Sequence, residues 1–186
     1  MKLMRVAARG LLKLMGWTVI DVPVRPEKAV VIGYPHTSNW DFPMALIGLA
    51  ALGFRPRWAG KDTMFVGWRG PIMRWLGGIP VNRRERTGFV DQMTKEFSRQ
   101  QEFLWVIAPE GTRKRTEGWK SGFYRIAVAA DVPVVAAVVD YPNRQVGFLA
   151  VLTLSGDEAT DMPMIAACYA GRQGCKPSNT SPIRLL

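Results

Sequence analysis

The sequence predicts a single α/β domain with a mixed, mostly parallel sheet flanked by helices. Segments with strand character alternate with helical segments along the chain, which is the order that builds such a sheet. Residues 103–108 form a continuous apolar run, as expected of a central strand that helices cover on both faces. The chain of 186 residues contains no repeat or linker and is long enough for one domain with a sizeable core.

The predicted elements are separated by turns of Gly, Pro and polar residues. Proline is tolerated in the first turn of a helix, so Pro43 indicates that the first buried helix starts near Trp40 or Asp41. Residues 141–144 predict a hairpin turn. We expect strands at residues 18–24, 29–34, 57–61, 77–81, 103–108, 132–140 and 145–154, and helices at residues 1–17, 41–52, 86–101, 121–130 and 157–170.

The composition excludes several classes of protein. Hydrophobic residues make up 48% of the chain, which is too much for a disordered protein. Cys168 and Cys175 are too few and too loosely spaced for a disulfide framework or a zinc knuckle. Since the chain also has a single histidine, we expect no transition-metal site, no cofactor and a reducing, cytoplasmic setting.

The net charge of +10 indicates an anionic partner: nucleic acid, a membrane surface or a phosphorylated substrate. The basic surplus lies within residues 1–126, whereas residues 127–186 carry four basic against five acidic side chains. The sequence offers no recognition helix or base-stacking motif, so we expect no nucleic-acid binding.

Residues 1–17 predict an amphipathic helix that contacts a membrane. A basic stripe lies opposite an apolar side, so lipid headgroups would meet one side and acyl chains the other. Four charges interrupt this segment, which excludes both a span of ~20 apolar residues and a signal peptide. The alternative is a helix docked on its own domain. The stripe consists of Lys2, Arg5, Arg9 and Lys13, and the apolar side of Leu3, Met4, Ala7, Leu11, Leu14 and Met15.

Residues 65–76 mix tryptophan and arginine around Gly70 and Pro71. One interpretation is ordinary core whose arginines extend their charged ends to solvent. The other is a lipid-facing surface, because Trp and Arg favour membrane interfaces.

His36 is the only histidine, so a side chain that takes and gives a proton near neutral pH is available at one position. We expect it on the loop after strand 29–34. There Asp41 would accept a hydrogen bond from one imidazole nitrogen and leave the other as a proton acceptor. Simpler interpretations are a surface histidine, and an Asp41 that acts as the helix N-cap or in a capping box with Ser38.

Three polar clusters interrupt otherwise apolar segments, and loops at strand ends are where α/β sheets assemble sites. A general base beside cationic groups suits chemistry on a hydroxyl of a phosphorylated compound, because the cations hold the phosphate. The alternatives are a surface ion pair of Arg113 and a solvated charge run at residues 83–86. No Gly-x-Ser-x-Gly motif is present, which argues against a serine hydrolase. The clusters are residues 36–41, Lys61 with Asn82 and Arg83, and residues 110–113.

Four short blocks complete the pattern: His36-x4-Asp41 (an HX4D motif), Gly-Ile-Pro-Val-Asn-Arg at 78–83, Pro-Glu-Gly-Thr-Arg at 109–113 and Val-Pro-Val at 132–134. In order and approximate spacing they resemble the four motifs of the glycerolipid acyltransferases, most of all the bacterial 1-acylglycerol-3-phosphate (lysophosphatidic acid) acyltransferases. Each block is weak alone, but the ordered set is specific. The resemblance covers about residues 29–140 and implies an acyltransferase domain over residues 18–170. Residues 171–186 predict a loose C-terminal tail.

The resemblance implies roles for individual residues. His36 would be the general base on the acceptor hydroxyl, with Asp41 as its orienting partner. The acceptor phosphate would bind to Arg83 and Arg113, and Lys61 would assist or face the developing oxyanion. The residues that shape the acceptor loop would be Glu110, Gly111 and Thr112.

The implied reaction is direct transfer of a fatty acyl group from acyl-CoA or acyl-carrier protein to a lysophospholipid hydroxyl. The acceptor would be 1-acylglycerol-3-phosphate, and the protein would act peripherally at the cytoplasmic face of an anionic membrane. Three positions depart from the usual motifs: Pro35 replaces Asn, Ala108 replaces an aromatic residue and Ala136 replaces a second proline. Another lyso-, glyco- or aminoacyl-lipid acceptor therefore stays open, as does a non-catalytic lipid-binding protein on the same scaffold.

Overall fold

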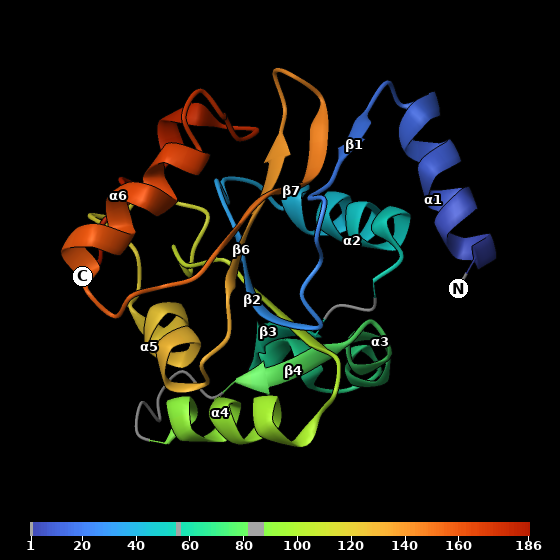
Figure 1. Cartoon of the computed structure of the whole chain (residues 1–186). Coiled ribbons are helices and arrows are strands. Elements are labelled where there is room, and N and C mark those ends of the chain that lie inside the picture. Colours follow the sequence, from blue (N-terminus) through green and yellow to red (C-terminus); the bar gives the residue numbers. More distant parts are fainter. Residues whose placement is uncertain (1, 55–56, 82–87) are drawn as a thin grey trace.

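The computed structural model describes residues 2–54, 57–81 and 88–186 of an α/β protein (Figure 1). The strands are β1 (Thr18–Ile20), β2 (Lys28–Gly33), β3 (Arg57–Lys61), β4 (Gly78–Val81), β5 (Phe103–Ile107), β6 (Val134–Asp140) and β7 (Gln145–Leu152). The α-helices are α1 (Lys2–Leu14), α2 (Asp41–Leu52), α3 (Arg69–Trp75), α4 (Phe89–Arg99), α5 (Gly122–Ala129) and α6 (Glu158–Cys168). Two 3-10 turns, η1 (Asp62–Phe65) and η2 (Pro177–Asn179), accompany them.

Within the described residues the strands form one sheet of order β1-β7-β6-β2-β5-β3-β4. Neighbouring strands are parallel, except that β6 and β7 form the predicted antiparallel hairpin. The mixed, mostly parallel sheet confirms the predicted fold class. Because β2, β5 and β3 are adjacent and parallel, their carboxyl ends meet at one edge of the sheet.

Helices cover both faces of the sheet: α1 and α2 lie on one face, and α5 and α6 lie on the other (Figure 1). Consecutive strand residues point to opposite faces. Val30 and Trp105 therefore pack in the aromatic-rich cluster under α4, α5 and α6. Their neighbours Val31 and Leu104 pack on the other face, under α2. This two-sided burial is the physical reason for the uninterrupted apolar sequence of β5.

The predicted helix at residues 1–17 forms, and it docks on α2 through Ala8 and Leu12. Its Arg9 Nε donates to the carbonyl of Ala51 at 2.9 Å, and Arg25 Nη1 donates to the carbonyl of Leu52 at 2.9 Å. The last turn of α2 contains no basic residue of its own, so these two arginines satisfy its carbonyls and complement its dipole. Part of the basic stripe thus binds the domain itself.

Three short helical segments were not predicted, η1, α3 and η2, because each is too short to show a helical period in the sequence. Gly77 ends α3 in the left-handed region, with φ 87°, where a side chain would be strained. Its N–H donates to the carbonyl of Arg74 at 2.9 Å.

Residues 171–186 pack on the domain rather than forming the predicted loose tail. The N–H of Trp119 donates to the carbonyl of Arg184 at 2.7 Å, and the N–H of Leu186 donates to the carbonyl of Trp119 at 2.9 Å. Trp119 itself is fully buried. Composition alone favoured a tail, but the segment finds backbone partners in the loop before α5, which satisfies its polar groups.

A buried aspartate makes the fold sensitive to acid. Asp161 is fully buried and accepts hydrogen bonds from Tyr124 Oη at 2.7 Å and from the N–H groups of Ser155 and Gly156. Burial raises the pKa of Asp161, but these hydrogen bonds outweigh burial and hold the pKa below its ordinary value. Since the folded state has the lower pKa, Asp161 stabilises the fold above about pH 4, and this contribution is lost as the pH falls further.

We therefore expect Asp161→Asn to lower the melting temperature at neutral pH and to flatten its decline between about pH 5 and pH 3. Circular dichroism melts at several pH values would measure both effects. Asp91→Asn, at an exposed position on α4, is the matched control. An acid profile identical to that of the unmodified protein would contradict the prediction.

Candidate active site

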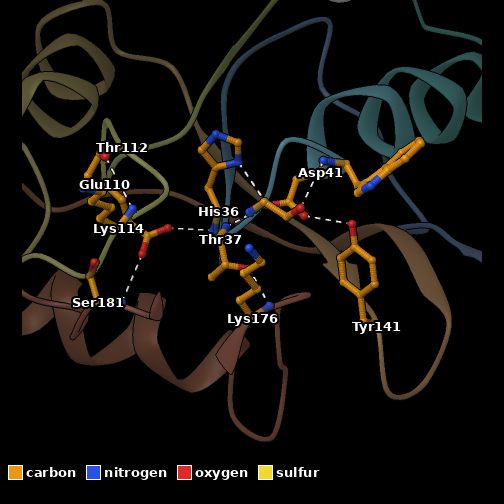
Figure 2. Close-up of polar contacts among 11 residues, drawn as sticks. His36, Thr37, Asp41, Glu110, Thr112, Lys114, Tyr141, Lys176 and Ser181 are labelled. Carbon is orange, nitrogen blue, oxygen red and sulfur yellow. Dashed lines mark hydrogen bonds and ion pairs between the residues drawn. The ribbon is translucent and has the colours of Figure 1, made fainter. Parts of the chain in front are cut away.

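The loops that follow β2 and β5 meet at the carboxyl edge of the sheet. Ile32 lies opposite Ile107 in the ladder, so the chain leaves the two strands at the same level. Beyond the strands, the backbone N–H of His36 donates to Glu110 Oε2 at 2.6 Å. Two of the three predicted polar clusters are thereby in direct contact (Figure 2).

His36 and Asp41 form the predicted pair. His36 Nδ1 lies 3.2 Å from Asp41 Oδ2, with the histidine side chain 24% exposed and the aspartate side chain 7% exposed. The other imidazole nitrogen points away from Asp41 (Figure 2). A buried carboxylate thus orients a partly exposed imidazole whose Nε2 points away from it, which is the geometry that a general base needs.

The loop backbone and a distant tyrosine hold the Asp41 carboxylate. Oδ2 accepts from the N–H groups of Thr37 at 2.7 Å and Ser38 at 2.8 Å, and Oδ1 accepts from Tyr141 Oη at 2.9 Å. The bonds from Thr37 and Ser38 hold the loop before α2, so Asp41 has a structural role beside its contact with His36. Asp41 is neither the N-cap nor half of a capping box with Ser38, because α2 begins at Asp41 and the Ser38 hydroxyl accepts from the N–H of Trp40 instead. The N-cap position itself is Trp40.

These contacts keep Asp41 ionised at neutral pH. Burial raises the pKa of Asp41, but hydrogen bonds from His36, Ser38, Tyr141 and Thr37 outweigh it and leave the pKa below its ordinary value. Burial and the bond to Asp41 raise the pKa of Tyr141, so its hydroxyl stays protonated and donates. The imidazole of His36 therefore lies beside a fixed negative charge.

Glu110 connects the His36 loop to the C-terminal segment. It is 1% exposed, and its second oxygen, Oε1, accepts from the N–H of Ser181 at 3.1 Å. Tyr34, directly after β2, donates its Oη to the carbonyl of Ser181 at 2.8 Å and holds the same C-terminal segment. Burial raises the pKa of Glu110, although the backbone hydrogen bonds oppose that effect. Glu110 braces the loops rather than offering a carboxylate to solvent.

The cationic groups predicted to hold a phosphate are only partly described. Arg113 is exposed in the loop that begins at Glu110, and Lys61 is exposed at the carboxyl end of β3, beside β5. Gly111 adopts φ 66°, which lets this loop turn sharply after Glu110. Thr112 Oγ1 accepts from the N–H of Lys114 at 3.4 Å. Arg83 lies outside the described residues.

Three supporting residues escaped the sequence analysis. Tyr141 and Ser181 contact the site from more than 70 residues away in the chain, and Lys176 donates its N–H to Thr37 Oγ1 at 3.1 Å. Gly174 permits that approach, because a Cβ there would come within 2.5 Å of Thr37 Oγ1. No local pattern marks these positions, since each is defined by the partner that it meets. In the described part of the chain, no cluster of three or more His, Cys, Asp or Glu side chains is arranged to bind a metal.

Comparison with known proteins agrees with this fold and identifies the family. Residues 18–140 match the family model described as Acyltransferase, and the chain therefore belongs to the acyltransferase family. The match includes all three polar clusters and confirms the family resemblance of the sequence motifs.

Among solved structures the chain is similar to the 1-acyl-sn-glycerophosphate (LPA) acyltransferase PlsC from Thermotoga maritima. The TM-score is 0.59 at 14% identity, over 91% of this chain and 75% of the other. At this identity the likeness concerns the fold. A comparison with curated protein sequences gave no significant match.

The Glu110 brace yields a prediction. Glutamine at this position has one acceptor oxygen, so its NH₂ group would face either the His36 or the Ser181 N–H. A buried donor left without a partner costs about 1–3 kcal/mol. We expect Glu110→Gln to lower the free energy of unfolding by about that amount in urea titrations, whereas Glu102→Gln, at an exposed position, leaves it unchanged. Equal stability of the two variants would exclude the brace.

Proposed function

We propose that this acyltransferase moves a fatty acyl group from an acyl thioester to the hydroxyl of a lysophospholipid, with 1-acylglycerol-3-phosphate as the acceptor. The observation that carries the proposal is the His36–Asp41 pair, in which Nδ1 and Oδ2 lie 3.2 Å apart and the imidazole is partly exposed. The exposed cations Lys61 and Arg113 at the same sheet edge support a phosphorylated acceptor.

The proposed reaction is direct transfer without an acyl-enzyme. Nε2 of His36 takes the acceptor hydroxyl proton as the hydroxyl oxygen attacks the thioester carbonyl carbon. Asp41 stabilises the imidazolium that forms, because its carboxylate is ionised and hydrogen-bonded to Nδ1. The carbon–sulfur bond then breaks, and the departing thiolate of CoA or acyl-carrier protein takes the proton from the imidazolium. The products are an ester and a free thiol.

Incubation of the purified protein with a panel of lysolipids and both thioester donors tests this function. We expect thiol release that depends on the acceptor and is fastest with 1-acylglycerol-3-phosphate. Faster turnover of an acceptor without a phosphate would shift the assignment to another lipid. Lysolipid binding without thiol release would instead indicate a non-catalytic lipid-binding protein.

We further propose that the protein works peripherally at a membrane, with α1 as the contact. None of the helices in the described residues has the length and apolarity that a membrane span requires. Docking through Ala8 and Leu12 leaves Leu3 84% and Leu14 88% exposed. Those side chains lie on the apolar side predicted to meet acyl chains.

The double variant Leu3→Gln/Leu14→Gln tests the role of α1 without uncovering the core that deletion of residues 1–17 would expose. We expect weaker sedimentation with anionic vesicles and an unchanged melting temperature. Met164→Gln, an exposed apolar position on α6, provides the control. Undiminished sedimentation of the double variant would mean that α1 is only a structural helix.

A further inference from the structure

The short helix α3 presents an exposed aromatic and basic surface. Trp68 is 75% exposed and Trp75 is 84% exposed, and Ile72 between them is 44% exposed. The Arg69 guanidinium lies 5.4 Å from the centre of the Trp68 ring, and Arg74 is also exposed. Tryptophan side chains are large and mostly buried in soluble proteins, so two exposed ones at the two ends of one short helix indicate a partner.

The side chains that link α3 to the sheet place it on the face covered by α1 and α2. Phe42 of α2 stacks edge-on against Trp58 of β3, with ring centres 4.7 Å apart. Trp58 in turn packs on Phe65, just before α3, at 5.8 Å. A Cβ on Gly60 or on Gly78 would collide with the Phe65 ring, so η1 and α3 lie close over this face of β3 and β4.

Helices α1, α2 and α3 therefore share one face of the sheet, with α2 in the middle (Figure 1). The outward side of α2 adds no charge, because its one ionisable residue is the buried Asp41. Trp40, immediately before α2 and 70% exposed, extends the apolar surface to the loop that carries His36.

The basic charge of these three helices favours an anionic binding partner. In the described residues of the three helices, all charged side chains other than Asp41 are basic. They are Lys2, Arg5, Arg9, Lys13, Arg69 and Arg74. Two exposed acids border this layer: Asp62 in η1, directly before α3, and Asp21, which pairs with Arg25 at the end of α2. Tryptophan with arginine favours the headgroup level of a bilayer, where the ring meets lipid and the guanidinium meets phosphate.

We propose that α3 is a second membrane-contacting element, and that Trp68 and Trp75 insert into the headgroup region of an anionic bilayer. Together with α1 it fixes the orientation of the protein at two points on one face. That orientation turns the loop between β2 and α2, and with it the His36 side chain, toward the lipid surface. The consequence for substrate access rests on the proposed function, but the membrane contact does not.

The double variant Trp68→Gln/Trp75→Gln tests this contact. Co-sedimentation with vesicles of phosphatidylglycerol and phosphatidylcholine should fall by about tenfold or more, because two large aromatic surfaces no longer leave water. Both side chains are largely exposed, so the melting temperature should not change. The control Val128→Gln/Met164→Gln alters exposed apolar positions on the opposite face and should bind vesicles normally.

Unchanged vesicle binding of the tryptophan double variant overturns the proposal. Loss of a dimer in size-exclusion chromatography, with vesicle binding retained, would also overturn it and assign the surface to a second copy of the chain. The tryptophan double variant should still transfer acyl groups to detergent-dispersed substrate, because that reaction needs no membrane contact. This measurement separates the proposed membrane contact from the proposed function. If the unmodified protein transfers no acyl group, the proposed function fails while the vesicle result still stands.

Discussion

Replacement of His36 by alanine is expected to lower kcat for acyl transfer by a factor of about a hundred to ten thousand. The reason is that no other histidine exists in the chain to accept the hydroxyl proton. The imidazole side chain is partly exposed and makes one described contact, with Asp41, so its removal leaves no cavity in the core. Folding and vesicle binding should therefore be preserved.

The measurement is thiol release at saturating donor and acceptor, alongside a thermal melt and a vesicle sedimentation assay. Asn39→Ala, at an exposed position in the same loop, is the matched control and should retain turnover. Full turnover by a well-folded His36→Ala protein would remove this residue from the mechanism and the HX4D interpretation with it.

Asp41→Asn is expected to have the second largest effect, a loss of about a hundredfold or more in kcat. The asparagine oxygen still accepts from Thr37 and Ser38, and its NH₂ group donates to the Tyr141 hydroxyl oxygen, so the loop keeps its shape. What disappears is the negative charge that stabilises the imidazolium. Activity should therefore fall far more than stability does.

Tyr141→Phe supplies the graded comparison for Asp41→Asn. It removes the 2.9 Å hydrogen bond to Oδ1 but keeps the carboxylate charge and most of the ring packing, including the edge contact to Trp17. We expect a loss of kcat of about tenfold, clearly smaller than that of Asp41→Asn. Equal losses in the two variants would show that position, not charge, is what Asp41 contributes.

The sequence was sufficient for features whose cause is local. Pro43 located the start of α2, and the apolar run of β5 predicted burial on both faces of the sheet. The spacing of His36 and Asp41 allowed their contact because only a short loop separates them. The alternation of strands and helices predicted the fold class, although the predicted strand at 18–24 is longer than β1 and the short helices η1, α3 and η2 were not predicted.

The tertiary structure alone decided which distant segments support the pair. Tyr141 reaches Asp41 because β6 lies beside β2, and Ser181 reaches Glu110 because residues 171–186 fold back over the loops after β2 and β5. It also decided that α1, α2 and α3 share one face. Periodicity and turn chemistry report on neighbours within a few residues. Strand order and the close approach of distant backbone groups depend instead on how the whole chain buries its apolar surface, and no short stretch of sequence contains that information.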